Sequence, residues 1–438
     1  MNKPFKFSAA VLSLCFGAAA CFSGCADRGR STLLASPAER GAVTFEERRT
    51  EEFSDIRTGA NAFAAKFSDE AYAAYSDGSN AAFAPVSVYM SLMLAGRCAS
   101  WQTRSQIDEA LGGGITLKGI EYLYASLNES YKTGKLTFGN SIWLQEGLEF
   151  IPECIDSLAE EYYCYSYSAD FRTDNEAANA SVRHFVREQT EGLIDCDFDL
   201  SQDTCFALVN ALYLKDNWNL FGDELSLTDE KYDFVNAFGE VKNTRLMSAY
   251  YAEGRPQKGG NYTTFYAKTY NGCRLHFLLP DDGVAVGDVF TESNISEVLA
   301  MSDYGGIDEA ERVRYYTRCL FPAFESSFNG DVKPVLERSF GITDLFDGDI
   351  CDLSSILPGG VNDYGYRAFS TKVQHVTKLS VDRRGIEGAA VTVIPADGAT
   401  SAEPWEEIRT DFVVDGAFGY VLTDSRGTVL FTGVVNDI

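Results

Sequence analysis

Residues 372–398 read KVQHVTKLSVDRRGIEGAAVTVIPADG, and the fold of the whole chain can be argued outward from this stretch. Its first part, residues 372–382, alternates apolar with polar residues, which is the period of a half-buried strand. Gly385 permits a sharp bend because glycine carries no Cβ. The small, uncharged run at 388–394 has the composition of a central strand, yet the chain turns polar directly after Pro395. An unpaired segment of this kind is normally an aggregation hazard.

Two interpretations of this window differ in where the small-residue run lies. In the first, residues 388–394 are a buried core strand that leads into an ordinary loop. In the second, the run is a strand that is held out of a sheet and is able to enter it. The window alone does not decide between them, so the rest of the chain has to.

Composition describes a large globular protein with a strongly acidic surface. The chain has 438 residues, of which 45% are hydrophobic, so a sizeable core can form in one large domain or two smaller ones. Lysine and arginine total 37 against 64 aspartates and glutamates, a net charge of −27. Such a surface repels phosphate backbones and anionic membranes, and no long basic cluster offsets it. We therefore expect no nucleic-acid partner.

The first residues have the pattern of an export signal. Lys3 and Lys6 precede a mostly apolar run at 7–20, which is too short for a stable membrane span. The sequence Phe-Ser-Gly-Cys that ends at Cys25 resembles a bacterial lipoprotein signal, in which the cysteine is lipidated and becomes the new N-terminus. An ordinary cleaved secretory signal, cut near Cys21, is the alternative.

These features predict the domain organisation and the location of the protein. Residues 1–24 are a lipoprotein signal peptide, residues 25–54 are a tether with little periodicity, and residues 55–438 form the folded domain. The protein is then extracytoplasmic and held at the cell surface or membrane through the lipid on Cys25. Free secretion is the alternative location.

Cysteine usage indicates neither a metal centre nor a disulfide scaffold. Three of the eleven cysteines lie in or at the end of the leader, and the other eight form no metal-binding spacing such as CxxC. Most of the eight sit among apolar residues and are expected to be buried thiols. The alternative is that one or two pairs of them form disulfides. They are Cys98, Cys154, Cys164, Cys196, Cys205, Cys273, Cys319 and Cys351.

The rest of the chain mixes helical and strand patterns, which predicts an α+β fold with mainly antiparallel sheets. Ser87 is the candidate N-cap of one short helix. The expected helices are 59–77, 89–95, 103–111 and 177–190. The expected strands are 136–144, 205–215, 262–270, 273–280, 312–321, 412–423 and 428–435, the last two joined by a turn at 424–427.

Enzyme chemistry finds no support in the sequence. The only histidines are His184, His276 and His375, which are too scattered to predict a metal site. His276 lies between two apolar residues and is interpreted as a buried strand residue. No nucleophile elbow, phosphate loop or dinucleotide fingerprint occurs. We predict a protein that is not an enzyme and needs no cofactor, with a hydrolase as a disfavoured alternative.

Five separated stretches resemble characteristic elements of one family, the serpins, in the same order along the chain. The resemblance runs from about residue 55 to the end and is specific when the stretches are taken together. They are residues 80–88 (NAAFAPVSV), 140–144 (NSIWL), 203–218 (DTCFALVNALYLKDNW), 375–392 (HVTKLSVDRRGIEGAAVT) and 431–436 (FTGVVN).

The resemblance implies three mainly antiparallel β-sheets, about nine helices, and an exposed reactive-centre loop after the strand at 372–382. In this family a serine protease attacks the loop and forms an acyl-enzyme. The cleaved loop then enters the central sheet as an added strand and distorts the protease before the ester hydrolyses. The implied function is that of a suicide substrate, expected to be monomeric, for which the partner supplies the catalytic residues.

The family pattern also implies which residues act in loop insertion. The hinge is Gly385, Ile386, Glu387, Gly388, Ala389, Ala390 and Val391. Ile386 stands where inhibitory members usually have threonine, Gly388 where alanine is usual, and Arg383-Arg384 replace an acidic start. Ser87, Asn210 and His375 match a polar cluster beneath the central sheet, in which the family's other serine is Ala84 here.

Two ways of counting along the loop give different scissile bonds. Counting by family spacing from Gly385 gives Ala399-Thr400, which suits an elastase- or subtilisin-like protease with a small pocket. Counting back from Phe418 gives a bond near Glu406-Glu407, because the loop is about seven residues longer than usual by the family's spacing. Arg409-Thr410 would suit a trypsin-like enzyme but fits neither count. A non-inhibitory serpin that binds other molecules is the alternative function, supported by the bulk of Ile386.

Overall fold

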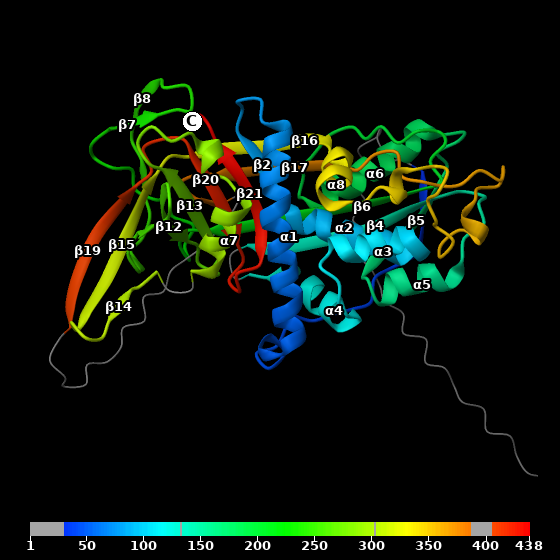
Figure 1. The fold of residues 1–438 in the computed structure, drawn as a ribbon, viewed down its shortest axis with the longest axis horizontal. Helices are drawn as coiled ribbons and strands as arrows, with labels where there is room; N and C mark the ends of the chain where they lie inside the picture. Colours follow the sequence, from blue (N-terminus) through cyan, green and yellow to red (C-terminus); the bar gives the residue numbers. More distant parts are fainter. Residues whose placement is uncertain (1–29, 132–133, 302–303, 387–404) are drawn as a thin grey trace, which may run out of the picture.

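The computed structural model describes residues 30–131, 134–301, 304–386 and 405–438 (Figure 1). These residues form eight α-helices, three main β-sheets and one two-stranded ribbon, so the predicted α+β fold is confirmed. All but two of the strand pairings are antiparallel, as expected. The family resemblance implied about nine helices, and eight lie within the described part of the chain.

The longest helix, α1, crosses the middle of the molecule (Figure 1). It begins eight residues before the predicted start at 59 because the Thr50 hydroxyl caps its first turn by accepting a hydrogen bond from the N–H of Phe53. The α-helices are α1 Glu51–Tyr75, α2 Pro85–Cys98, α3 Trp101–Ala110, α4 Leu117–Ser126, α5 Pro152–Glu160, α6 Asn175–Gln189, α7 Glu292–Ala300 and α8 Lys333–Phe340.

The central sheet has the strand order β1-β5-β4-β6-β18-β17-β16, with β3 beside β4. One of its faces covers a large apolar core that also includes buried residues of α1, α2 and α8. The strands are β1 Ser31–Ala35, β3 Glu129–Ser130, β4 Lys135–Gln145, β5 Cys164–Ala169, β6 Phe206–Asn217, β16 Phe324–Asp331, β17 Gln374–Val381 and β18 Gly385–Ile386.

Two further sheets complete the fold, and the long strands of the third lie at one end of the molecule (Figure 1). The second sheet contains β11 Gln257–Lys258, β12 Tyr262–Lys268, β13 Arg274–Pro280, β20 Phe418–Thr423, β21 Val429–Val435 and β2 Ala81–Phe83. The third contains β9 Met247–Ser248, β10 Ala252–Glu253, β14 Ile307–Asp308, β15 Val313–Phe321 and β19 Glu406–Val413, and the ribbon is β7 Tyr232–Val235 with β8 Val241–Thr244.

The strand predicted at 412–423 is in fact two strands in different sheets, so that prediction is wrong. The break falls at Asp415, whose carbonyl accepts the N–H of Val235, and at Ala417, whose N–H donates to the Val235 carbonyl. These bonds with β7 lead the chain from β19 to β20. The apolar pattern runs on through the break because Val414 is itself buried, so periodicity alone does not reveal it.

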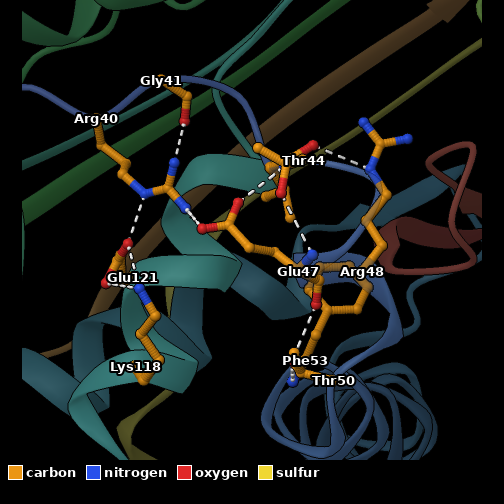
Figure 2. Close-up of polar contacts among 10 residues, drawn as sticks. Arg40, Gly41, Thr44, Glu47, Arg48, Thr50, Phe53, Lys118 and Glu121 are labelled. Atoms are coloured by element: carbon orange, nitrogen blue, oxygen red, sulfur yellow. Dashed lines mark hydrogen bonds and ion pairs between the residues drawn. The ribbon is translucent and has the colours of Figure 1, made fainter.

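Part of the segment predicted as a tether is folded against the domain. β1 pairs with the edge of the central sheet, with Ser31 opposite Ala169. Farther on, the Arg40 guanidinium contacts Glu121 at 2.7 Å and Glu47 at 2.9 Å (Figure 2). A hydrogen bond from the Thr44 N–H, together with Arg40, lowers the pKa of Glu47 to about 2. An edge strand whose residues are nearly all exposed carries no alternation, which is why the sequence pattern missed it.

Two further observations concern the state of the cysteines and the possibility of a membrane-spanning helix. All eight cysteines of the body are free thiols, and six of them are buried. Among the described residues, no helix combines the length and apolar character that a membrane span requires. The predicted leader, including Cys25, lies outside the described residues.

Candidate functional site at the opening of the central sheet

The central sheet is interrupted between β6 and β17. β6 pairs along its length with β4, and β17 pairs along its length with β16. In the described part of the chain no ladder joins β6 to β17; they are linked only through the two residues of β18 at one end. Within the described residues, a strand is therefore missing between β6 and β17 beyond β18.

β18 is the start of that missing strand, and it forms a tight hairpin with β17. The Asp382 N–H donates to the Gly385 carbonyl at 2.8 Å, and the Asp382 carboxylate accepts the N–H groups of Arg384 and Gly385. Ile386 pairs with Val381 on one side and Asp216 on the other, and its side chain is fully buried. The bulk of Ile386, which supported the non-inhibitory alternative, is thus accommodated within the sheet.

The hairpin turn is fastened to the chain that follows β6. The Trp218 N–H donates to the Arg384 carbonyl at 3.2 Å, and its indole Nε1 donates to the Asp382 carbonyl at 2.7 Å. Glu224 then pairs with both arginines of the turn, at 2.7 Å to Arg383 and 3.3 Å to Arg384. The basic residues that depart from the family pattern therefore have a specific carboxylate partner. Sequence reasoning missed Glu224 because no spacing links it to the turn.

Asp216 is a second polar residue at this end of the opening that sequence reasoning missed. It lies near the end of β6 and is buried. Its carboxylate accepts hydrogen bonds of 2.6 Å from the Thr269 hydroxyl and from the Asn271 amide, which lie between β12 and β13. Burial raises the pKa of Asp216 to about 7, although the two hydrogen bonds oppose that rise.

The predicted polar cluster meets at the first turns of α2, beneath the interruption. Asn210 on β6 donates from Nδ2 to the Ser87 carbonyl at 2.8 Å and to the Ser91 hydroxyl at 2.6 Å. His375 on β17 accepts at Nε2 from the main-chain N–H of Ala84 at 3.1 Å. Ala84, which stands in the place of the family's other serine, thus takes part through its main-chain N–H. Asn210 and His375 each hold one side of the opening to the same helix.

Ser87 takes a different place from the one predicted. α2 begins at Pro85, so Ser87 lies in its first turn, and the N-cap residue is Ala84, which has no capping side chain. Pro85 can start the helix because its missing N–H would have no partner in a first turn. The contribution of Ser87 to the cluster is its main-chain carbonyl, and Ser91 supplies the hydroxyl.

The histidine of the cluster is neutral at ordinary pH. Burial lowers the pKa of His375 to about 4 because a charged imidazolium is poorly solvated in the core. The Thr377 hydroxyl lies 3.2 Å from the same Nε2 atom that accepts the Ala84 N–H. A neutral ring whose Nε2 is an acceptor satisfies the Ala84 contact, whereas protonation at Nε2 would oppose it.

α6 lies against the face of the sheet opposite α2 (Figure 1). Its Val182 and Phe185 pack with Trp143 of β4. Partly buried residues from both sides of the opening, Val209 on β6 and Val376 on β17, contact the same apolar cluster. Any strand that enters between β6 and β17 would therefore be sandwiched between α6 and the core.

Several predicted site residues lie outside the described ranges. They are Cys25, Glu387, Gly388, Ala389, Ala390, Val391, Ala399 and Thr400. The alternative bond at Glu406-Glu407 lies in β19, which pairs with β15 over eight successive positions. The bond at Arg409-Thr410 lies in the same strand.

The three histidines are far from forming one catalytic site. His276 is buried on β13 as predicted, and its Nδ1 lies 2.9 Å from the Tyr304 hydroxyl. His184 lies on α6 beside Glu188, and His375 belongs to the cluster beneath the sheet. Over the described ranges, no group of three or more metal-ligating side chains comes together.

Comparison with known proteins identifies the family that this architecture resembles. The family model described as Serpin (serine protease inhibitor) matches residues 58–438. An alpha-1-antitrypsin-like protein of Ictidomys tridecemlineatus is 26% identical over 339 residues, covering 73% of this chain and 75% of the relative. Serpin-ZX of Arabidopsis thaliana is 27% identical over 381 residues, covering 83% of this chain and 93% of the relative.

Solved structures agree at the level of the fold. The native state of Tengpin, a thermophilic serpin, superposes with a TM-score of 0.70 and 20% sequence identity. The superposition covers 93% of this chain and all of that structure.

Proposed function

The chain belongs to the serpin family, and from this premise we propose that it inhibits serine proteases as a suicide substrate. The family is one of protease inhibitors and not of enzymes. The observation that carries the proposal is the interruption of the central sheet, where β18 already occupies the first positions between β6 and β17. A protease would attack the chain beyond β18, and the cleaved segment would continue as a strand into the interruption.

The register of β18 supports this continuation. Ile386 lies opposite Asp216 on β6 and opposite Val381 on β17, both antiparallel. Extending both registers would set Thr392 opposite Asn210 on one side and His375 on the other. The Thr392 hydroxyl would then reach the polar cluster that holds the two sides of the opening to α2. Insertion would exchange those bonds for new ones instead of leaving buried polar groups unsatisfied.

Side-chain alternation in the extended strand also favours insertion. Because Ile386 points into the apolar core, every second residue after it would point the same way. These residues are Gly388, Ala390, Thr392 and Ile394, none of which carries a charge. In the same register Ala396 would lie opposite Phe206, the first residue of β6. Nearly the whole edge of β6 would therefore be paired by residues that precede Ala399.

The bond Ala399-Thr400 remains the favoured site of attack. A protease cleft takes an extended segment whose main chain is free to pair with the enzyme. Glu406-Glu407 and Arg409-Thr410 lie in β19, so attack at either bond would first require that β19 separate from β15. A small residue at Ala399 suits an elastase- or subtilisin-like enzyme.

We also propose that the protein is anchored outside the cytoplasm through a lipid on Cys25. The support is the leader pattern before Cys25, together with the short span between that cysteine and β1 at Ser31. Radiolabelled palmitate should be incorporated by the wild type and lost in Cys25→Ala. Equal labelling of the two proteins would rule the anchor out.

The inhibitor proposal is tested by mixing the protein with pancreatic elastase, subtilisin and trypsin. The expected product is a complex of the summed mass that survives denaturing electrophoresis, with release of a C-terminal fragment beginning at Thr400. Cleavage without any stable complex would overturn the proposal and favour the non-inhibitory alternative.

A matched pair of variants tests the direction in which the hinge enters. Ala390→Arg would aim a charge at the core and should convert the protein into a substrate that is cleaved and released. Ala389→Arg would aim the same charge at the opposite face, beside α6, and should retain more trapping. Equal loss in both variants would contradict the extended register.

A further inference from the structure

One face of the third sheet carries a row of neighbouring arginine, aromatic and acidic side chains. β15 contributes Arg314, Tyr316 and Arg318, which alternate onto the same face. The parallel strand β19 sets Glu407, Arg409 and Asp411 directly opposite them. This set, together with Tyr251 and Trp405, is called the arginine–tyrosine column below.

The members of the column are stacked on one another. The Arg318 guanidinium lies 5.4 Å from the centre of the Tyr251 ring, and the Arg409 guanidinium lies 5.3 Å from the same ring. Arg409 is also 5.9 Å from the Tyr316 ring. Tyr251 thus contacts two guanidinium groups. Contacts of this geometry are attractive because the aromatic face carries partial negative charge.

Ion pairs fix the same arginines in place. Arg318 makes a two-pronged contact with Asp411 at 2.9 and 2.7 Å, and Arg409 pairs with Glu407 at 3.0 Å. At the start of β19, the Arg314 guanidinium lies 5.6 Å from the Trp405 ring. These side chains are therefore ordered before any partner arrives, which lowers the entropy that binding would cost.

The column is accessible and has the composition of an interaction surface. The side chains of Arg409 and Arg318 are 58% and 34% exposed. Tyrosine, tryptophan and arginine are the residue types that carry most of the binding free energy at protein interfaces. Each guanidinium has five N–H donors, so Arg409 and Arg318 retain donors beyond those used by Glu407 and Asp411. The surface is suited to carboxylate and carbonyl acceptors of a partner.

The column lies close in the sequence to the bond that we expect a protease to attack. Trp405 follows Ala399 by six residues, so even a fully extended chain keeps it within roughly 20 Å of the favoured bond. A protease domain has a radius of gyration on the order of 17 Å. An enzyme bound at Ala399-Thr400 would therefore extend over the beginning of β19 and the adjacent face of β15.

We propose that the arginine–tyrosine column is a docking surface for the attacking protease, contacted outside its substrate cleft. The surface that it fits is one that presents carboxylate or carbonyl groups on the side of the cleft that holds the leaving segment. The inference rests on the proposed function, because it takes the protease to attack the Ala399-Thr400 bond, which precedes β19 in the sequence. It goes beyond that function because it makes protease choice depend on β15 and β19 as well as on the loop sequence.

The test compares two arginine-to-alanine variants of equal net charge. Arg409→Ala removes the central guanidinium of the column. Arg104→Ala is the control, because Arg104 is also exposed, at 40%, and is paired with Asp108 on α3. For each protein we would measure the rate constant for loop cleavage by the protease that cuts the wild type fastest. A free peptide of residues 390–404, which lacks the column, reports on the cleft alone.

The expected result is a fall in the cleavage rate constant of about tenfold for Arg409→Ala and less than about twofold for Arg104→Ala. The fraction of cleaved molecules that trap protease should be the same in both variants, because the hinge is untouched. Equal rates in the two variants would overturn the inference. So would a fall that occurs only with a lower melting temperature, since the effect would then be one of folding.

This readout separates the docking surface from the inhibitor proposal. Cleavage without trapping in every variant would overturn the inhibitor proposal, while a selective effect of Arg409→Ala on the cleavage rate would still support docking. If no protease of the panel cuts between residues 387 and 404, both proposals fail.

Discussion

At the scale of single residues, polar side chains on both sides of the interruption in the central sheet bond to the main chain at the start of α2. His375 accepts from the Ala84 N–H, and Asn210 donates to the Ser87 carbonyl. Replacing His375 would leave the Ala84 N–H at the start of α2 without its partner inside the core, which typically costs about 1–3 kcal/mol. The cluster is therefore both a stabilising feature and the point at which an entering strand would have to compete.

The first prediction concerns acid and His375. Burial lowers the pKa of His375 to about 4, whereas a histidine of the unfolded chain titrates near 6.5. In this window the unfolded state binds a proton that the native state does not, so the free energy of unfolding falls as the pH falls. The loss attributable to this residue should reach about 3 kcal/mol by pH 4.

Urea unfolding from pH 7 to pH 4 measures this loss. His375→Gln should flatten the pH dependence, while His184→Gln, on the exposed face of α6, should leave it unchanged. The assignment to His375 is wrong if both variants follow the wild-type curve.

The second prediction concerns Asp216 and has the opposite sign. Burial raises the pKa of Asp216 to about 7, so the native state holds a proton that the unfolded chain releases above about pH 4. The stability that this residue contributes is present at low pH and is lost as the pH rises toward 7. Asp216→Asn should remove that loss and raise the free energy of unfolding at pH 7 by about 1–4 kcal/mol.

Denaturant unfolding at pH 5 and pH 8 checks the Asp216 prediction. The expected gain at pH 8 should be much smaller at pH 5, where the native carboxyl is already neutral. Asp223→Asn, in the loop after β6, is the control. A gain of the same size at both pH values would mean that the asparagine acts by packing and not by removing a charge.

At the scale of elements, the hairpin of β17 and β18 is the structure from which insertion would begin. Its turn is held by Trp218 and by the pairing of Glu224 with Arg383 and Arg384. A preformed hairpin lowers the entropic cost of adding further residues, because the first strand positions are already ordered. Because Glu224 contacts this turn, we expect it to influence loop insertion through the turn.

The third prediction is that Glu224→Gln loosens this turn. The paired side chains are partly exposed, so the effect should be modest, within about 1 kcal/mol. We expect faster hydrogen exchange in a peptide covering residues 380–386 and about two to five times more inhibitor consumed per protease trapped. Glu337→Gln, which breaks a comparable pair with Lys333 on α8, is the control. Unchanged exchange in Glu224→Gln would show that the ion pairs do not hold the hairpin.

At the scale of the whole molecule, no ladder joins β6 to β17 beyond β18 within the described residues, and this region has α6 on one face and α2 on the other. Pairing both edges with one strand would add hydrogen bonds on two sides and bury the small residues of the hinge. Such pairing would be the thermodynamic basis of the conformational change that we propose after cleavage. The acidic surface, with a net charge of −27, adds a long-range attraction for basic proteases that salt should weaken.

The fourth prediction is that cleavage stabilises the molecule. Protein nicked in the loop should unfold at a temperature more than about 10 °C above that of the intact protein, because several kcal/mol of new strand pairing is gained. Scanning calorimetry before and after limited elastase treatment measures the shift. An unchanged or lower melting temperature in the nicked protein would show that the loop does not enter the sheet.

Sequence alone determined the class of the fold and most element positions. Strong period-two alternation marked β17, and helical periodicity marked α6, because each of these elements buries one face against the core. The residues of the polar cluster were also identified in advance. They could be identified because Ser87, Asn210 and His375 each lie within a stretch that resembles the family.

Only the tertiary structure decided which partners these residues have. Glu224 pairs with Arg383 and Arg384, Asp216 bonds to the turn between β12 and β13, and the N–H of Ala84 donates to His375. The arginine–tyrosine column likewise exists only because β19 lies parallel to β15. Periodicity reports which face of an element is buried, but contacts between residues more than 50 positions apart, such as the 53 between Asp216 and Thr269, depend on how sheets and helices are stacked. A local pattern cannot encode that stacking, and here the stacking creates the site.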